Sequence, residues 1–233
     1  MRAMSKRAAI VALTLVASLL FALPSASADS TKNRNETPRE ARNEKSEKVK
    51  CKKTDVTTRF PKPIDMPRGI SKKLPVTVSF ETNCGQIVIE TLTRQAPLTL
   101  TVVSRLIRSG YYDKTICHRL TTEDFYFLQC GDPTGTGFGS PDFDYKADNL
   151  PTSREFIYAA GTVVMVNTSF RRNGSQFMIF YEDSKLPMGY TVWGRVTSGL
   201  EIVRFIAEGG VKNAESDGVP LRTIAIDRAS TNN

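Results

Sequence analysis

The chain has 233 residues, a formal net charge of +8, and 40% hydrophobic and 24% charged residues, which fits one globular domain with additional terminal segments. It contains one histidine, His118, so a zinc site built from several histidines and any mechanism that needs two imidazoles are excluded. The four cysteines show no CxxC spacing, which argues against a structural zinc site.

The positive charge is concentrated near the start of the chain. Residues 1–28 carry +3, residues 29–55 carry +3, and residues 56–233 carry only +2. Because the part of the chain that can form a domain is nearly neutral, the charge does not indicate a nucleic-acid partner, and we expect none.

Residues 1–28 have the pattern of an export signal peptide. A basic start is followed by the apolar run Ala8–Leu23 and by the small-residue triplet Ala26-Ser27-Ala28. The run is short for a membrane-spanning helix, which needs about 20 residues. We therefore expect an exported protein of the extracellular space or cell envelope, cleaved after the triplet. An uncleaved membrane anchor is the alternative.

Residues 29–55 mix basic, acidic and amide side chains and contain almost nothing that could be buried. Such a segment cannot compensate for the entropy lost on ordering, so the sequence predicts a disordered charged tether. A weak contact of this basic tail with an anionic envelope surface stays open, although the mixed charge argues against it.

In an oxidising compartment the even number of cysteines can pair.

Residues 56–233 show the patterns of a folded domain, whose core we place at about 76–226. Alternating apolar and polar residues over Val76–Thr82 and Gln86–Glu90, with a turn between them, predict an antiparallel hairpin. A helical spacing of apolar residues begins at Pro97.

The rest of the domain shows one further amphipathic helix, Leu200–Ala207, and a series of short strands. These strands are expected at Thr115–Leu120, Tyr126–Cys130, Thr162–Val166, Phe177–Tyr181, Thr191–Val196 and Leu221–Ile226. Many short strands with only two helices favour a closed antiparallel β-barrel with the helices at its ends.

Two catalytic motifs are excluded by their sequence context. The glycine-rich stretch 135–139 leads into an acidic, irregular stretch rather than a helix, so it does not predict a phosphate-binding loop. No GxSxG motif accompanies His118, which argues against a serine hydrolase.

Polar residues on the strands indicate a groove. Arg119 and Gln129 lie on two strands expected to pair, so a hairpin would place both on one face. Asn167 is predicted to end one apolar strand and Gln176 to open another. Together they would line an apolar groove with convergent hydrogen-bonding groups, unless they merely terminate strands. His118 faces away from Arg119 and is expected to be buried and hydrogen-bonded.

Five ordered blocks of sequence carry a resemblance to a known family. They are GYYDKTICHRL from Gly110, LQCGDPTGTG from Leu128, AGTVVMVN from Ala160, NGSQFMI from Asn173 and YTVWGRV from Tyr190. In this order and spacing they resemble the cyclophilin family of peptidyl-prolyl cis-trans isomerases, and most of all its exported bacterial branch. The resemblance implies a mainly β fold, an eight-stranded antiparallel β-barrel capped by two α-helices, with no cofactor and no metal.

The same resemblance assigns the site. It makes Arg119 the catalytic residue and Trp193 a core residue. Val166 and Thr168 replace small residues on the rim that receives the residues preceding proline, so they would narrow substrate choice or slow turnover. The implied substrate-binding residues are Tyr126, Phe127, Gln129, Val166, Asn167, Thr168, Gln176, Met178, Leu186 and Tyr190.

The implied activity is rotation about X-Pro bonds of exported polypeptides during their folding, with proline-containing polypeptides as substrates and a monomer as the working form. One alternative is a cyclophilin-like module that holds Pro-containing segments with little turnover. Another is a folded domain whose tail, residues 29–55, does the work as an envelope-binding arm.

Strand alternation also makes a prediction about the cysteines. Cys117 shares a face with Arg119, whereas Cys130 faces away from Gln129. If Arg119 and Gln129 both face the groove, the two cysteines lie on opposite faces. We therefore expect no disulfide between them in a hairpin without a bulge.

Overall fold

The computed structural model describes residues 48–61, 63–153, 155–187 and 189–232. The expected signal peptide, residues 1–28, and residues 29–47 of the expected tether lie outside the described residues. Within the described ranges, no helix combines the length and the apolar character that crossing a membrane requires.

The described residues form thirteen strands, two α-helices and one short 3-10 helix, η1. Their bounds are β1 Thr77–Thr82, β2 Gly85–Thr91, α1 Pro97–Arg108, β3 Thr115–Ile116, β4 Arg119–Thr121, β5 Phe127–Cys130, β6 Tyr145–Lys146, β7 Glu155–Tyr158, β8 Thr162–Ser169, β9 Arg172–Phe180, β10 Ser184–Pro187, β11 Val192–Ser198, α2 Leu200–Glu208, η1 Lys212–Ala214, β12 Asp217–Gly218 and β13 Ala225–Asn232.

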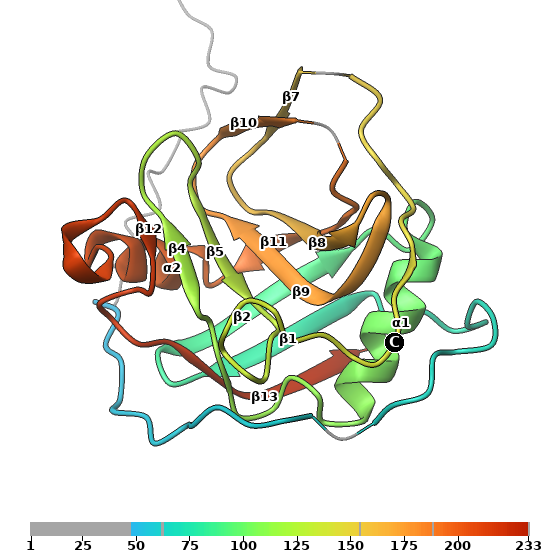
Figure 1. The fold of residues 1–233 in the computed structure, drawn as a ribbon, viewed down its shortest axis with the longest axis horizontal. Helices are drawn as coiled ribbons and strands as arrows, with labels where there is room; N and C mark the ends of the chain where they lie inside the picture. Colours follow the sequence, from blue (N-terminus) through green and yellow to red (C-terminus); the bar gives the residue numbers. More distant parts are fainter. Residues whose placement is uncertain (1–47, 62, 154, 188, 233) are drawn as a thin grey trace, which may run out of the picture. The chain divides into compact units, whose positions relative to one another are not determined.

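Eleven strands form one sheet in the order β12-β4-β5-β9-β8-β11-β2-β1-β13-β3, with β6 paired to β9 (Figure 1). Three of them, β3, β6 and β12, have only two residues, which leaves eight longer strands. Only Cys117 and His118 separate β3, which pairs with β13, from β4, which pairs with β5. The mainly β, antiparallel fold with two helices is confirmed, whereas the structure shows a curled sheet of eleven strands rather than the closed eight-stranded barrel that the sequence predicts.

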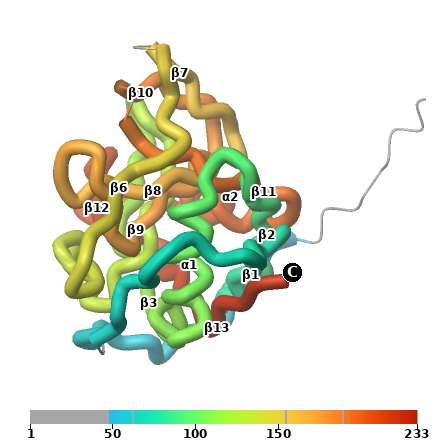
Figure 2. The backbone as a smooth tube through the Cα atoms, turned by 90° about the vertical axis from the view of Figure 1, so that its right-hand side faces the viewer, coloured from blue at the N-terminus to red at the C-terminus, as the bar shows by residue number. Residues whose placement is uncertain are grey.

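The two predicted helices are confirmed and lie at opposite sides of the sheet (Figure 1). α1 begins with Pro97, whose missing N–H needs no partner in the first turn, and it packs against β13. α2 follows Gly199, which has a φ of +92°, and packs against β2. Figure 2, turned by 90°, shows α1 nearer the viewer than α2.

Alternation along the strands divides the apolar residues into two clusters. On β9, Phe177 and Ile179 belong to the main core, whereas Met178 and Phe180 point to the other face. There they join a second, smaller cluster, which we call the outer cluster. It consists of Phe127, Tyr158, Val164, Met178, Phe180 and Leu186.

The strands β8 and β9 are longer than predicted. Asn167 does not end its strand and Gln176 does not open one, because β8 continues to Ser169 and β9 begins at Arg172. The backbone pairing continues, with irregular register, beyond the apolar residues that marked the strands in the sequence. Side-chain periodicity does not report such an extension, since its residues are polar, although Asn173, Ser175 and Gln176 of β9 are buried.

The predicted tether is corrected at its C-terminal end, because residues 48–55 are held on the domain. Cys51 forms a disulfide with Cys84. The backbone N–H of Lys52 donates to the carbonyl of Asn83 at 2.8 Å, and Nδ2 of Asn83 donates back to the carbonyl of Lys52 at 2.9 Å. A covalent bond and backbone pairing thus order a segment whose composition offers little to bury.

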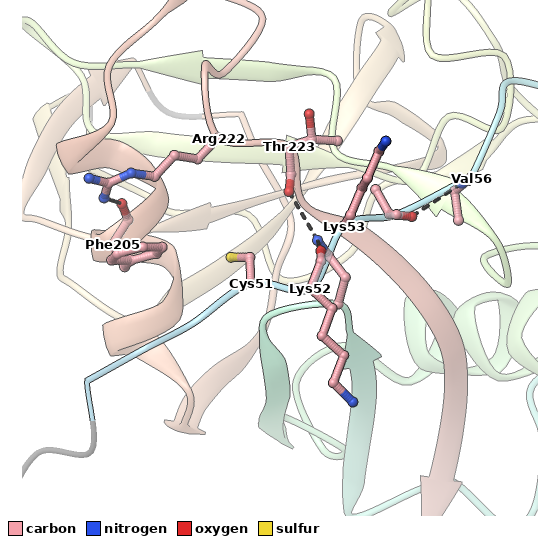
Figure 3. Close-up of a pocket in the computed structure, with 9 residues that line it drawn as sticks. Cys51, Lys52, Lys53, Val56, Phe205, Arg222 and Thr223 are labelled. Carbon is pink, nitrogen blue, oxygen red and sulfur yellow. Dashed lines mark hydrogen bonds between the residues drawn. The ribbon is translucent and has the colours of Figure 1, made fainter.

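A cavity of about 710 Å³ lies beside this N-terminal segment (Figure 3). The figure shows Cys51, Lys52 and Lys53 near Thr223, with Arg222 and Phe205 at the other end of the cavity. None of its lining residues belongs to the site that the sequence predicts.

The prediction that Cys117 and Cys130 are not bonded is wrong, because they form a disulfide. The backbone N–H of His118 donates to the carbonyl of Gln129 at 3.1 Å, although the ladder partner of Gln129 is Arg119. Two successive residues therefore oppose Gln129, as in a β-bulge. The extra residue shifts the register and brings Cys117 opposite Cys130.

Candidate active site

A chain of side-chain hydrogen bonds begins at Arg119. On the paired strands β4 and β5, Arg119 lies opposite Gln129, and its Nη1 donates to Oε1 of Gln129 at 3.2 Å. Nε2 of Gln129 donates in turn to Oε1 of Gln176 at 2.7 Å. Because a guanidinium can only donate, the amide of Gln129 has one orientation that satisfies both contacts.

The chain continues into the glycine-rich stretch 135–139. Nε2 of Gln176 donates to the carbonyls of Gly137 and Gly139, at 2.9 and 2.8 Å. The buried carboxylate of Asp132 holds this loop, since it accepts the backbone N–H groups of Thr134 and Gly137, both at 2.7 Å. Burial alone would raise the pKa of Asp132, but hydrogen bonds from Thr134 and the loop backbone hold it below its usual value. The loop positions Gln176.

The outer cluster forms an apolar floor beside Arg119. Phe127, Met178 and Leu186 have exposed fractions of only 3%, 3% and 6%. The Cζ atom of Arg119 lies 5.2 Å from the ring centroid of Phe127. Tyr190 is half-buried and packs against the same cluster. A permanently charged donor thus borders an apolar surface.

Strand β8 carries the three residues expected on the rim. Val166 is half-buried against the outer cluster, Asn167 donates from Nδ2 to the carbonyl of Gly189 at 2.9 Å, and Thr168 is exposed. A cavity of about 330 Å³ lies next to them. It is lined by Gly137, Phe138, Ser140, Val166, Asn167, Thr168, Ser175 and Gln176. Val166 therefore stands between the apolar floor and this cavity, whose lining also includes Gln176.

Tyr126 is the one expected site residue that the structure places elsewhere. It packs against the main core and makes an edge contact with Tyr181, with the ring centroids 5.9 Å apart. It directly precedes Phe127, and neighbouring residues of an extended segment point to opposite faces. Trp193 is fully buried in the main core, as predicted.

His118 is buried, as predicted, with an exposed fraction of 6%. In the part of the chain that the structure describes, neither ring nitrogen of His118 makes a well-formed hydrogen bond to another residue. Burial lowers the pKa of His118, and the positive charge of Arg119 lowers it further, against an opposing effect of Asp132.

Asp217 is a neighbour of Arg119 that the sequence does not reveal. Nε of Arg119 donates to Oδ1 of Asp217 and Nη2 donates to Oδ2, both at 2.7 Å. This pair raises the pKa of Arg119 and lowers the pKa of Asp217. Asp217 follows Arg119 by 98 residues and lies in an exposed two-residue strand, so no periodicity marked it.

The arrangement suits a ligand with an apolar ring and a polar atom beside it. The floor can hold the ring, the guanidinium of Arg119 can donate to the polar atom, and Gln129 and Gln176 offer amide groups next to it. The 330 Å³ cavity leaves room for the residues that precede such a ring along a peptide.

Comparisons with known proteins find relatives of this chain by sequence and by fold. A probable peptidyl-prolyl cis-trans isomerase B of Mycobacterium tuberculosis is 36% identical over 181 residues, which cover 71% of this chain and 58% of that protein. A crystal structure of a cyclophilin type peptidyl-prolyl cis-trans isomerase from Cryptosporidium parvum has a TM-score of 0.57 at 26% identity, covering 69% of this chain and 99% of that one.

A second structure of the Cryptosporidium parvum protein, determined in the presence of the dipeptide Ala-Pro, has a TM-score of 0.52 at 28% identity. It covers 67% of this chain and 99% of that one. The chain thus spans somewhat more than half the length of the mycobacterial relative. The model of the family "Cyclophilin type peptidyl-prolyl cis-trans isomerase/CLD" matches residues 77–231. This chain therefore belongs to the cyclophilin-type peptidyl-prolyl cis-trans isomerase family.

Proposed function

We propose that this protein catalyses cis-trans isomerisation of X-Pro peptide bonds and acts on exported polypeptides as they fold. The observation that carries the activity is the position of Arg119 at the edge of the outer cluster, with Gln129 hydrogen-bonded beside it. Membership of the cyclophilin-type family supports the same activity.

The chemistry needs binding and orientation rather than a nucleophile. Rotation about the bond breaks amide resonance against a barrier of about 18 to 20 kcal/mol. In the twisted state the prolyl nitrogen becomes pyramidal and gains a lone pair, which a donor can stabilise. Arg119 is such a donor, while the floor of Phe127, Met178 and Leu186 would hold the proline ring. An acceleration of about a hundred-thousandfold corresponds to roughly 7 kcal/mol, within reach of positioning plus one charged hydrogen bond.

Export is supported by two observations. Residues 1–28 have the pattern of a signal peptide. In addition, the four cysteines form the pairs Cys51–Cys84 and Cys117–Cys130, as expected in an oxidising compartment. Secreted or envelope polypeptides that contain proline are therefore the proposed substrates.

The test is a protease-coupled assay with a proline-containing peptide anilide that the helper protease cleaves only in the trans form. We expect first-order acceleration proportional to the protein concentration, and loss of it in Arg119→Ala. Binding of the peptide without acceleration would instead identify a holding module, in which Val166 and Thr168 restrict the rim. Binding to anionic vesicles that is lost when residues 29–47 are deleted would add an envelope contact through the tail.

A further inference from the structure

Asp217 and Arg119 form a two-pronged ion pair at the edge of the site. Both oxygens of the carboxylate accept a hydrogen bond from the guanidinium, Oδ1 from Nε and Oδ2 from Nη2, each at 2.7 Å. Such parallel contacts hold the plane of the guanidinium as well as its position. Both side chains are about half exposed, with exposed fractions of 42% for Arg119 and 51% for Asp217.

The fold places Asp217 there through the short strand β12. This strand lies beside β4 (Figure 1). The two strands are antiparallel, with Asp217 opposite Thr121 and Gly218 opposite Leu120. Arg119 and Thr121 share a face of β4, so Asp217 is the diagonal cross-strand neighbour of Arg119. The backbone N–H of Thr122 donates to the carbonyl of Ser216 at 2.8 Å and ties the loop before β12 to β4.

The hydrogen bonds of Arg119 to other residues use some of its N–H groups and leave others for a ligand. A guanidinium has five N–H groups, of which Asp217 occupies one on Nε and one on Nη2, and Gln129 occupies one on Nη1. One N–H on each terminal nitrogen therefore remains for a ligand. Because Asp217 and Gln129 hold the guanidinium from two sides, these remaining donors have a defined direction.

We infer that Asp217 is a positioning residue, which holds the guanidinium of Arg119 in the orientation that serves the prolyl nitrogen. This inference rests on the proposed isomerase function. An ion pair between exposed side chains contributes little to stability, so the effect of Asp217 is expected in turnover rather than in folding. It acts through Arg119 and does not itself contact the rotating bond.

The experiment compares kcat and KM of the full chain with those of Asp217→Ala, Asp217→Asn and a matched control, Glu215→Ala. Glu215 is an exposed acid in the loop before β12, with no hydrogen bond or ion pair to Arg119. We expect kcat to fall about tenfold in Asp217→Ala with KM within about twofold, and to fall less in Asp217→Asn, which keeps one acceptor. Glu215→Ala should match the parent, which would exclude a simple effect of lost negative charge.

A double-mutant cycle separates positioning from a structural role. In the Arg119→Ala background, adding Asp217→Ala should change the residual rate by less than about 1.5-fold, because the group it positions is absent. A similar loss in both backgrounds, or a lowered melting temperature, would overturn the inference in favour of a structural role. If the parent is active and the Asp217→Ala variant has an unchanged or raised kcat, the inference about Asp217 is wrong but the proposed function stands. If the parent itself is inactive, the proposed function is wrong, and this inference with it.

Discussion

Arg119 and Gln129 face each other across β4 and β5, and Nη1 of the arginine donates to Oε1 of the glutamine at 3.2 Å. This contact sets the direction of every later hydrogen bond in the chain, because Gln129 must then donate to Gln176. Gln176 must in turn donate to the carbonyls of Gly137 and Gly139. The site is therefore connected from β4 to the loop that Asp132 organises.

Replacing Arg119 by alanine should lower kcat/KM about a hundredfold or more, on the order of 2.7 kcal/mol, because the donor to the prolyl nitrogen is lost. The melting temperature should hardly change, since the side chain is 42% exposed and outside both apolar clusters. Coupled-assay kinetics and calorimetry check both values. Near-normal turnover in this variant would refute the role assigned to Arg119.

The double substitution Val166→Ala with Thr168→Ala should broaden the range of residues accepted before proline. Both residues line the 330 Å³ cavity, and Val166 also packs against the outer cluster, so shortening the two side chains enlarges the cavity. Profiling kcat/KM over a set of X-Pro peptides tests the effect, with Lys185→Ala as an exposed control outside the cavity. Identical profiles of the double variant and the parent would exclude the steric explanation.

Removing the disulfide with Cys51→Ala and Cys84→Ala should lower the free energy of unfolding by about 3 to 4 kcal/mol by the loop-entropy model. The bond closes a loop with a sequence separation of 33 residues, and it secures the segment 48–55 on the domain. Denaturant unfolding measures the difference, and Lys53→Ala is the control at an exposed neighbour. Unchanged stability would mean that the backbone bonds to Asn83 suffice to hold this segment.

The melting temperature should fall as the pH is lowered from about 7 to 5.5, because of His118. In the unfolded chain this imidazole titrates near about 6.5, whereas in the folded protein burial lowers its pKa. Between the two pKa values the unfolded state binds more protons, so stability is complete above about 6.5 and is lost as the pH falls below it.

His118→Phe should flatten this dependence, since the chain has no other histidine. Calorimetry of parent and variant at four pH values across the range tests the difference. A parallel fall in both proteins would assign the pH dependence to other groups.

Several elements could be predicted because their signals are local. The helix that begins at Pro97 and the one that begins at Leu200 show an apolar spacing that one face of a helix explains. The hairpin of β1 and β2 follows from alternation on both sides of a turn. Arg119, Gln129 and Gln176 belong to sequence blocks that resemble a family, and the structure joins their side chains.

Other features depend on pairing between distant strands. Tyr126 lies in the expected block, but its side chain packs on the opposite side of the strand from Phe127. The extra residue at His118 shifts the register and allows the disulfide between Cys117 and Cys130, contrary to regular alternation. The one extra residue brings Cys117 and Cys130 to the same face of the hairpin. Neither the composition nor the periodicity of the sequence indicates such an extra residue.

The sequence by itself determined the helices, most of the strands, the concentration of positive charge in residues 1–55 and the block of residues around Arg119. Only the tertiary structure decided that Asp217 forms an ion pair with Arg119 and that Cys51 forms a disulfide with Cys84. The physical reason is that periodicity describes which face a side chain occupies within one element. Contacts between residues 33 and 98 positions apart arise only when the strands are paired in one register and the loops are closed.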